Sequence, residues 1–300
     1  MHDTFAMPRP FYIVDVFAER PYAGNQLAVV VGDEGLTDVV MQEIAAETNF
    51  SDTTFVASAP EPDGAYRVRI FTPALELAFA GHPILGTAWV IRHHLAANAS
   101  GGLAVHLAAG RIPVAFEAAA DGGEVVWFTA PPMRLGPTCA REPMAAALGV
   151  SPGDIETKAP VQELSAGTAA LIVPLRSLEA LRRSRLDLGA FAPLADQGFS
   201  PLVYLFCTET RHPENDLSAR FFFEAHGTRE DPATGSAAAF LGAYLLEHRF
   251  FPASELSLRI EQGYELGRPS LVMLRARGVG DARDVRVGGR VIPIVQGELL

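Results

Sequence analysis

Two stretches half a chain apart decide the fold: His82-Pro83-Ile84-Leu85-Gly86-Thr87-Ala88 and Asp231-Pro232-Ala233-Thr234-Gly235-Ser236-Ala237. They share the pattern H/D-P-x-x-G-T/S-A, and the offset from position 82 to position 231 is 149 in a chain of 300 residues. Each stretch opens a run that is apolar nearly all round, which is typical of a helix enclosed by other elements. An internal duplication is the economical explanation. The alternative is two unrelated helix starts built from the same common residues.

Outward from these stretches, the residue pattern predicts short strands and a few helices in both halves. Apolar runs bounded by turn residues are typical of strands, and Thr37 and Asp38 suit the start of a helix. The first-half prediction is strands at 11–17, 26–31, 53–58, 65–72, 103–107, 112–116 and 124–128, with helices at 38–47 and 83–96. The second-half prediction is helices at 142–148 and 233–246, with strands at 169–173, 202–207 and 219–223 and further strands to the C terminus.

The run 130–138 is rich in proline and glycine, which breaks the pattern of strands. We therefore place a domain boundary there and expect domains at 1–128 and 129–300. The last strand of the chain can also pack on the N-terminal domain.

The composition excludes several classes of function. The formal net charge is -11, with 24 Lys and Arg against 35 Asp and Glu and no basic cluster, so nucleic acid and anionic membrane surfaces are poor partners. Lys158 is the single lysine, which leaves no P-loop and one badly placed candidate for pyridoxal chemistry. A small molecule is the partner that we expect.

The sequence also predicts a cytoplasmic location and no membrane attachment. Cys139 and Cys207 lie far apart without a CxxC pair, and the first ten residues lack the character of a signal peptide. No apolar run approaches the ~18 residues of a membrane span.

Each of the two motif stretches is also a candidate cradle for a carboxylate. Small residues at a helix start let an anion approach the free backbone N–H groups at the positive end of the helix dipole. The candidate donors are the amides around Gly86, Thr87, Gly235 and Ser236. In a duplicated protein we expect the two helix starts to flank one ligand at the interface between the halves, with His82 and Asp231 beside it. Taken singly, His82 is better explained as a solvent-facing or capping histidine and Asp231 as an N-cap, and only their equivalence in the repeat favours the functional interpretation.

A third candidate lies in the segment 49–56, where a predicted helix gives way to a strand. Asp52 is flanked by Phe50 and Phe55, and burial against aromatic rings would favour its protonated form and let it transfer protons at neutral pH. The alternative is that Asp52 only forms the turn.

Five segments together resemble the phenazine-biosynthesis PhzF-like isomerase family, which shares its fold with diaminopimelate epimerase. They are VDVFAERPYAGNQLAVV (14–30), ETNFSDTTFV (47–56), FTPALELAFAGHPILGTA (71–88), EDPATGSAAAFLGAYL (230–245) and EQGYELGRPSL (261–271). The resemblance covers nearly the whole chain. It implies an α+β fold of two similar domains, each a curled, mostly antiparallel sheet wrapped around a central apolar helix. It also implies an active site between the domains, and usually a homodimer.

The resemblance further implies roles for single residues. In the phenazine isomerases, the glutamate after the serine of an NxSE turn moves a proton within dihydro-3-hydroxyanthranilate, helped by the histidine of AGHP and the aspartate of EDxATGS. These positions correspond to Asp52, His82 and Asp231. We expect the substrate to be bound by residues of the same motifs, namely Asn25, Ser51, Gly81, Gly86, Thr87, Gly235 and Ser236. Asp52 is one methylene shorter than the family glutamate, and a displacement of about 1 Å can cost on the order of a hundredfold in rate.

Other chemistries fit the sequence less well. Diaminopimelate epimerase and its relatives use two cysteines at the repeated motifs, where this chain has 80–82 and 232–234 without cysteine. The pair His93-His94 comes with no HExxH motif and no acidic cluster, so we expect no metal. The run 278–284 lacks the third glycine of a dinucleotide fingerprint and is predicted to be a turn, so we expect no cofactor.

The leading hypothesis is a cofactor-independent isomerase of a small cyclic carboxylic acid. Asp52 would be the general acid/base, while His82 and Asp231 would hydrogen-bond the substrate. The alternative is a metabolite-binding protein of the same fold that has lost catalysis. Exchange of solvent deuterium into a candidate substrate would discriminate between the two, because a binding protein shows none.

Overall fold

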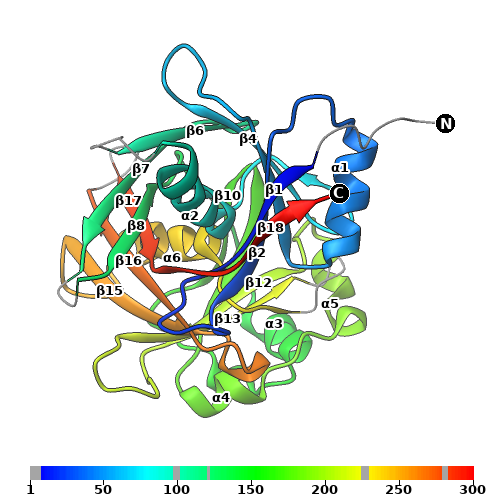
Figure 1. The fold of residues 1–300 in the computed structure, drawn as a ribbon. Helices are drawn as coiled ribbons and strands as arrows, with labels where there is room; N and C mark the ends of the chain where they lie inside the picture. The colour runs from blue at the N-terminus through cyan, green and yellow to red at the C-terminus, as the bar shows by residue number, and fades with distance from the viewer. Residues whose placement is uncertain (1–7, 97–101, 120–121, 224–229, 279–282) are drawn as a thin grey trace. The chain divides into compact units, whose positions relative to one another are not determined.

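The computed structural model describes residues 8–96, 102–119, 122–223, 230–278 and 283–300, and it contains two compact units (Figure 1). The first unit comprises Met1–Thr129 and Gly288–Leu300, and the second comprises Ala130–Val287. Most of the predicted turn at 278–284 lies outside the described residues.

The first unit is a curled sheet around helix α2 (Gly81–Val90). Its strands pair in the order β18 (Val291–Leu299), β1 (Arg9–Val16), β2 (Asn25–Val31), β3 (Asp52–Val56), β4 (Tyr66–Phe71), β6 (Leu103–Leu107), β7 (Gly110–Ala118) and β8 (Glu124–Thr129). The pairs β2–β3 and β4–β6 are parallel and the others are antiparallel. The short strand β5 (Glu76–Leu77) pairs with β4 just before α2 begins.

Helix α2 is central because its sequence has no polar face, and nine of its ten residues are buried. It packs against β1, β2, β3, β6 and β8 (Figure 1). Gly86 permits this close approach, since a Cβ atom there would lie 2.5 Å from Leu27 Cδ2 and 2.9 Å from Val16 Cγ2. The helix continues as one π-helical turn, η1 (Ile91–Leu95). Burying each large aliphatic side chain of such a helix contributes roughly 1.5–3 kcal/mol.

Helix α1 (Asp38–Thr48) packs against β3 and β4 in the same unit. It begins as the sequence predicts: Thr37 is the N-cap, and its side chain accepts a hydrogen bond from the Val40 amide at 3.3 Å. Asn49 ends the helix in the left-handed conformation with φ 54°, which turns the chain directly into β3.

The second unit repeats this plan around α6 (Gly235–Glu247), which buries ten of its thirteen residues. Its strands pair in the order β9 (Arg134–Cys139), β10 (Val161–Ala166), β11 (Thr168–Pro174), β12 (Leu202–Cys207), β13 (Leu217–Phe223), β15 (Glu255–Gln262) and β16 (Ser270–Arg277). The pairs β11–β12 and β13–β15 are parallel. The remaining elements are α3 (Arg141–Leu148), η2 (Pro152–Asp154), α4 (Leu178–Arg183), α5 (Leu188–Ala195), β14 (Glu230–Asp231), η4 (Tyr264–Leu266) and β17 (Asp284–Gly289).

The pairing pattern confirms two similar α+β halves. In both units the order of parallel and antiparallel pairs is the same, and a two-residue strand, β5 or β14, precedes the central helix. The outer strands follow the same rule: β18, after β17 in sequence, pairs with β1, and β9, after β8, pairs with β10. Each unit therefore takes its outer strand from the end of the other half of the sequence.

The repeat has a different register from the one that the shared motif predicts. Helices α2 and α6 begin at Gly81 and Gly235, and the strands before them pair as Ile70 with Leu77 and Phe221 with Asp231. The helix starts are 154 positions apart, and so are Leu77 and Asp231, whereas Ile70 and Phe221 on the longer strands are 151 apart. None of these offsets is 149, and Asp231 corresponds to Leu77 and not to His82. The shared glycines serve different purposes, because Gly86 packs inside its helix while Gly235 begins one.

The segment 130–138 also differs from its prediction as a pattern-breaking loop, since residues from Arg134 onward form β9. Its pairing with β10 is irregular between Gln162 and Leu164, as expected where Pro137 removes a backbone donor. The sequence reading further missed β10, α4 and α5.

Candidate active site

Three polar side chains converge in the first unit, where β2, β3 and α2 begin. Asn25 and Asp52 are the first residues of β2 and β3, and His82 is the second residue of α2. Because β2 and β3 are parallel neighbours, both strands start at the same edge of the sheet. The exposed fractions are 1 % for Asn25, 5 % for Asp52 and 3 % for His82. The fold thus buries together three residues that the sequence analysis had selected.

One nitrogen of the His82 ring contacts both of the other side chains. The Nδ1 atom is 3.2 Å from Asn25 Nδ2 and 3.5 Å from Asp52 Oδ2. Burial lowers the pKa of His82 to about 3, against a smaller opposing effect of a hydrogen bond with the Gln26 backbone. The imidazole is therefore neutral at physiological pH.

The other ring nitrogen, Nε2 of His82, is buried and has no hydrogen-bond partner in the described part of the chain. Leaving a buried polar atom unsatisfied costs about 1–3 kcal/mol. Such an atom beside a carboxylic acid is a candidate contact for a substrate.

Two other predicted binding residues of this unit, Gly86 and Thr87, serve the packing of helix α2. Thr87 is fully buried, and its hydroxyl lies 2.8 Å from that of Thr54, which ties α2 to β3. Because α2 begins at Gly81, the amides of Gly86 and Thr87 belong to its hydrogen-bond ladder. This corrects the expectation that they bind an anion: within the helix, the amides that have no intrahelical partner are those of Gly81 and His82, since Pro83 has no N–H and the Ile84 amide is the first to bond within the helix. Ser51 is half-buried next to Asp52.

The second unit holds a separate polar group around Asp231. This residue ends β14 and is 7 % exposed, and its Oδ2 atom accepts a hydrogen bond from the Thr234 hydroxyl at 2.6 Å. Gln262, the last residue of β15, contacts the same loop. Helix α6 begins at Gly235, so the amides of Gly235 and Ser236 do lie at a helix start, as predicted.

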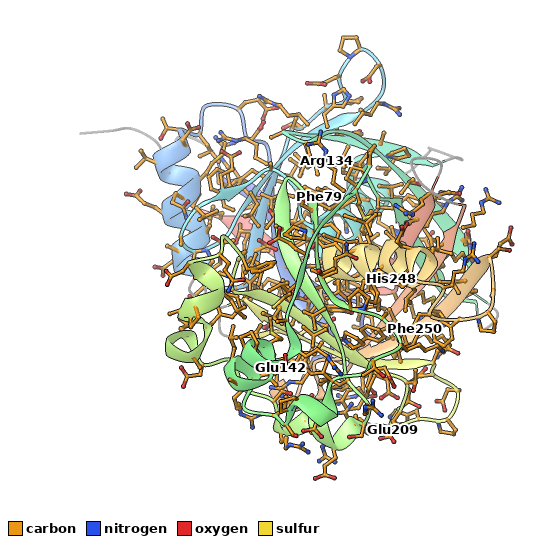
Figure 2. The ribbon with its side chains drawn as sticks, turned by 180° about the vertical axis from the view of Figure 1, so that it is seen from behind. Phe79, Arg134, Glu142, Glu209, His248 and Phe250 are labelled. Atoms are coloured by element: carbon orange, nitrogen blue, oxygen red, sulfur yellow. The ribbon has the colours of Figure 1, made fainter. Side chains whose placement is uncertain are left out.

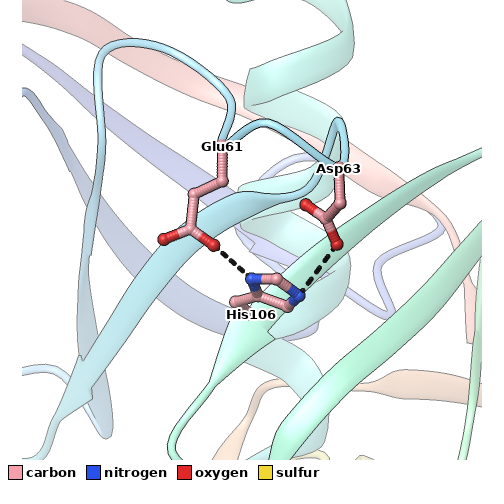
Figure 3. Close-up of side chains that lie close together, drawn as sticks. All are labelled: Glu61, Asp63 and His106. Atoms are coloured by element: carbon pink, nitrogen blue, oxygen red, sulfur yellow. Dashed lines mark hydrogen bonds and ion pairs between the residues drawn. The ribbon is translucent and has the colours of Figure 1, made fainter.

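A third polar cluster, which the sequence analysis missed, joins Glu61 and Asp63 to His106 on β6 (Figure 3). Nδ1 of His106 contacts Glu61, and Nε2 lies 3.2 Å from Asp63 Oδ2. Arg111 Nε is 3.3 Å from the same oxygen of Asp63. Carboxylates contact both ring nitrogens and an arginine lies beside one of them, so the polar groups of the cluster satisfy one another.

The second unit has a counterpart of His106, which indicates what this cluster does. In the parallel strand pairs, Arg67 is opposite His106 and Ser218 is opposite Glu261, so Glu261 is the counterpart of His106. Glu261 accepts hydrogen bonds at 2.8 Å from the amides of Arg211 and His212, in the connection that precedes β13. In each unit this position fastens the loop between the third and fourth strands of the repeat, which is a structural role.

The two cysteines have no nucleophilic character. Burial raises the pKa of Cys139 to about 11 and that of Cys207 to about 12, so both thiols stay protonated at neutral pH. Neither belongs to a polar group described above.

The fold of the chain is also that of a solved epimerase structure. A hydroxyproline epimerase from Agrobacterium vitis shares it with a TM-score of 0.64 at 12% identity, over 99% of this chain and 93% of that one.

The described residues include no helix that is long and apolar enough to cross a membrane.

More specific comparisons give the family. The sequence matches the family of phenazine biosynthesis-like proteins, PhzC-PhzF, over residues 14–297. It is 35% identical to the trans-2,3-dihydro-3-hydroxyanthranilate isomerase of Pseudomonas aeruginosa, over 96% of this chain and 98% of that protein. A PhzF-family structure from Bacillus anthracis has a TM-score of 0.86 at 25% identity, over 98% of this chain and 99% of that one. The chain belongs to the PhzC-PhzF family, as the sequence resemblance indicated.

Proposed function

We propose that this protein is an isomerase that moves a proton within a small cyclic carboxylic acid, with Asp52 as the general acid/base. The contact between Asp52 and the neutral ring of His82 is the observation that carries the proposal. A buried carboxyl group beside a neutral imidazole can take a proton from carbon and return it to another position. Exclusion of water from such a site keeps the proton with the substrate.

His82 and Asn25 complete this arrangement. The uncharged imidazole can offer one donor and one acceptor, and its Nε2 atom is available to a polar group of the substrate. Asn25 fixes the ring from the side of Nδ1. The amides at the start of α2 supply the positive end of a helix dipole for a substrate carboxylate.

The name of one relative supports the proposed substrate class. The Pseudomonas aeruginosa relative is named for trans-2,3-dihydro-3-hydroxyanthranilate, and we propose that this chain accepts that compound or another cyclic carboxylate of similar size. Asp231, with Gly235 and Ser236, serves the same reaction in this proposal. The chain acts as a homodimer and without a cofactor.

Exchange of solvent deuterium tests the proposal. Wild-type protein incubated in D2O with dihydro-3-hydroxyanthranilate should form the isomer, with deuterium incorporated to the extent that Asp52 exchanges its proton with solvent. Asp52→Asn should abolish turnover and remain folded. Asp33→Asn is a matched control: Asp33 is a buried aspartate of the same unit, 4 % exposed and ion-paired with Arg67 at 2.9 Å, and its loss should leave turnover unchanged.

Two outcomes would contradict the proposal. Full activity of Asp52→Asn would remove Asp52 from the mechanism. Thermal stabilisation of the wild type by the compound, with neither isomer nor deuterium incorporation, would favour a binding protein that has lost catalysis.

A further inference from the structure

A buried glutamine holds the loop that carries Asp231. Gln262 is 1 % exposed. Its Nε2 atom donates to the Asp231 carbonyl oxygen at 2.9 Å and to Thr234 Oγ1 at 3.1 Å. Its Oε1 atom accepts from the Thr234 amide at 3.2 Å and from the Tyr204 hydroxyl at 3.4 Å. Two donors and two acceptor positions are all that a glutamine amide offers, so its orientation is fixed.

This amide sets the direction of the neighbouring hydroxyl group. Thr234 Oγ1 accepts a hydrogen bond from Gln262 Nε2 and lies 2.6 Å from Asp231 Oδ2. The hydroxyl proton of Thr234 therefore points at Asp231 Oδ2, which acts as the acceptor. The relay from Gln262 through Thr234 holds one carboxylate oxygen of Asp231 in place.

The next residue, Gly263, brings the backbone against the same loop. Its φ is +79°, and a Cβ atom there would lie 2.5 Å from the carbonyl oxygen of Pro232 and 2.3 Å from that of Arg268. Only glycine permits this approach. The dipeptide Gln262-Gly263 thus contacts three of the four residues from Asp231 to Thr234.

The repeat shows that the strand itself does not require a glutamine. The register that makes Glu261 the counterpart of His106 makes Leu107 the counterpart of Gln262. Leu107 is apolar and buried. Burying an amide instead of a leucine costs free energy unless the amide is hydrogen-bonded. The hydrogen-bond partners of Gln262 named above all belong to the Asp231 loop, apart from Tyr204.

We propose that Gln262 is a positioning residue, which orients the Asp231 carboxylate through the hydroxyl of Thr234. The proposal rests on the proposed function, in which Asp231 acts on the substrate. Gln262 itself does not touch the reacting atoms. Its effect should appear in turnover and in its pH dependence rather than in folding alone.

Two variants test this role, with a buried glutamine of the same unit as the control. Gln262→Leu installs the residue of the other repeat, and Gln262→Glu keeps the shape but removes both donors. The control is Gln162→Leu. Gln162 lies on β10 and is 9 % exposed. Its side chain donates to the Gly136 carbonyl oxygen at 2.9 Å and contacts His248 at 2.6 Å (His248 is labelled in Figure 2). For each purified full-length protein we would solve the ligand-free crystal structure and measure kcat and KM for dihydro-3-hydroxyanthranilate against pH.

We expect the Thr234 Oγ1 to Asp231 Oδ2 contact to be lost in both Gln262 variants, with kcat reduced about 10- to 100-fold and its pH profile displaced. Gln162→Leu should keep the contact and a kcat within about twofold of wild type. An intact contact with unchanged kcat in the Gln262 variants, or an equal fall of kcat in Gln162→Leu, would overturn the role. A wild type without isomerase activity would refute the proposed function. The crystal structures alone would then show whether Gln262 positions Asp231. Gln262→Glu gives the answer if Gln262→Leu does not fold.

Discussion

Nδ1 of His82 lies 3.5 Å from Oδ2 of Asp52, and both side chains are more than nine-tenths buried. The distance and the opposite formal charges would suit an ion pair. Burial, however, lowers the pKa of His82 to about 3, and a neutral ring carries no charge to pair. We therefore interpret the contact as one between an acid and a neutral imidazole, which places both groups for proton transfer without a fixed positive charge.

The first prediction concerns the pH dependence of stability. The imidazole of His82 titrates near 6.5 in the unfolded chain and at about 3 in the folded one. The unfolded state therefore binds more protons below pH 6.5, so this contribution to stability is complete above that pH and is lost as the pH falls towards 3. Between pH 7 and pH 5 the free energy of unfolding should fall by about 2 kcal/mol from this residue.

Urea unfolding at pH 7 and pH 5 checks this value. His82→Asn removes the titrating ring, while other groups such as His248 remain in both proteins and cancel in the difference. The wild type should lose about 2 kcal/mol more than His82→Asn between the two pH values. Equal losses would show that His82 is not buried as a neutral ring.

The second prediction is the effect of Asp52→Glu. This change gives position 52 the longer glutamate that the sequence resemblance implies for it, and extends the carboxyl group by about 1 Å, a displacement that can alter a rate by on the order of a hundredfold. We expect higher kcat/KM for dihydro-3-hydroxyanthranilate if the shorter acid alone limits that reaction. A fall in kcat/KM, measured beside a circular dichroism control for folding, would mean that the pocket is shaped for an aspartate and for a different substrate.

These predictions rest on residues that the sequence could identify to different degrees. Asp52, His82 and Asp231 follow from local motifs, since each stands in a short segment that a reader can match. The contact between Thr54 and Thr87 depends on β3 lying against α2, which no local pattern shows. Gln262 is separated from Asp231 by 31 positions, and only the register of β13 against β15 makes its repeat counterpart visible.

The shared motif is a case where sequence similarity gave the right architecture with the wrong register. Glycine at 86 and at 235 has two different physical causes, close packing against Leu27 in one and a helix start in the other. Strand pairing settles the register, because Leu77 and Asp231 occupy the same position on β5 and β14. Pairing between distant segments is the information that a single sequence lacks.

The third prediction concerns a buried ion pair next to Asp231. Arg220 and Glu230 form two contacts of 2.7 and 2.8 Å, and Arg220 Nη1 also donates to the carbonyl oxygens of Leu181, Arg182 and Ser184. Arg220→Met leaves the Glu230 carboxylate buried without its partner, which should cost about 3–5 kcal/mol of stability. Urea unfolding would measure the loss.

The matched control for that variant is Arg277→Met. Arg277 pairs with Asp284 at 3.1 Å, but its side chain is 60% exposed, so the pair is screened by water and its loss should cost less than about 1 kcal/mol. A loss for Arg220→Met as small as that for Arg277→Met would contradict the role of burial. Because Glu230 precedes Asp231 on β14, Arg220→Met should also lower isomerase turnover.

The last prediction is that His82 and Asp231 act on one ligand, although they belong to different units of the chain. Binding of 3-hydroxyanthranilate, an aromatic and unreactive relative of the proposed substrate, would be measured by calorimetry for His82→Ala, Asp231→Ala and the double variant. Each single change should weaken binding, because each removes a buried hydrogen-bonding group. If both groups touch the same molecule, the double variant should lose less than the two single losses together, by at least about 0.5 kcal/mol. His82→Ala combined with Gln162→Leu is the control and should be additive. Strictly additive losses for His82→Ala and Asp231→Ala would mean that the two groups serve separate sites, and Asp52 and His82 would then have to carry out the reaction without Asp231.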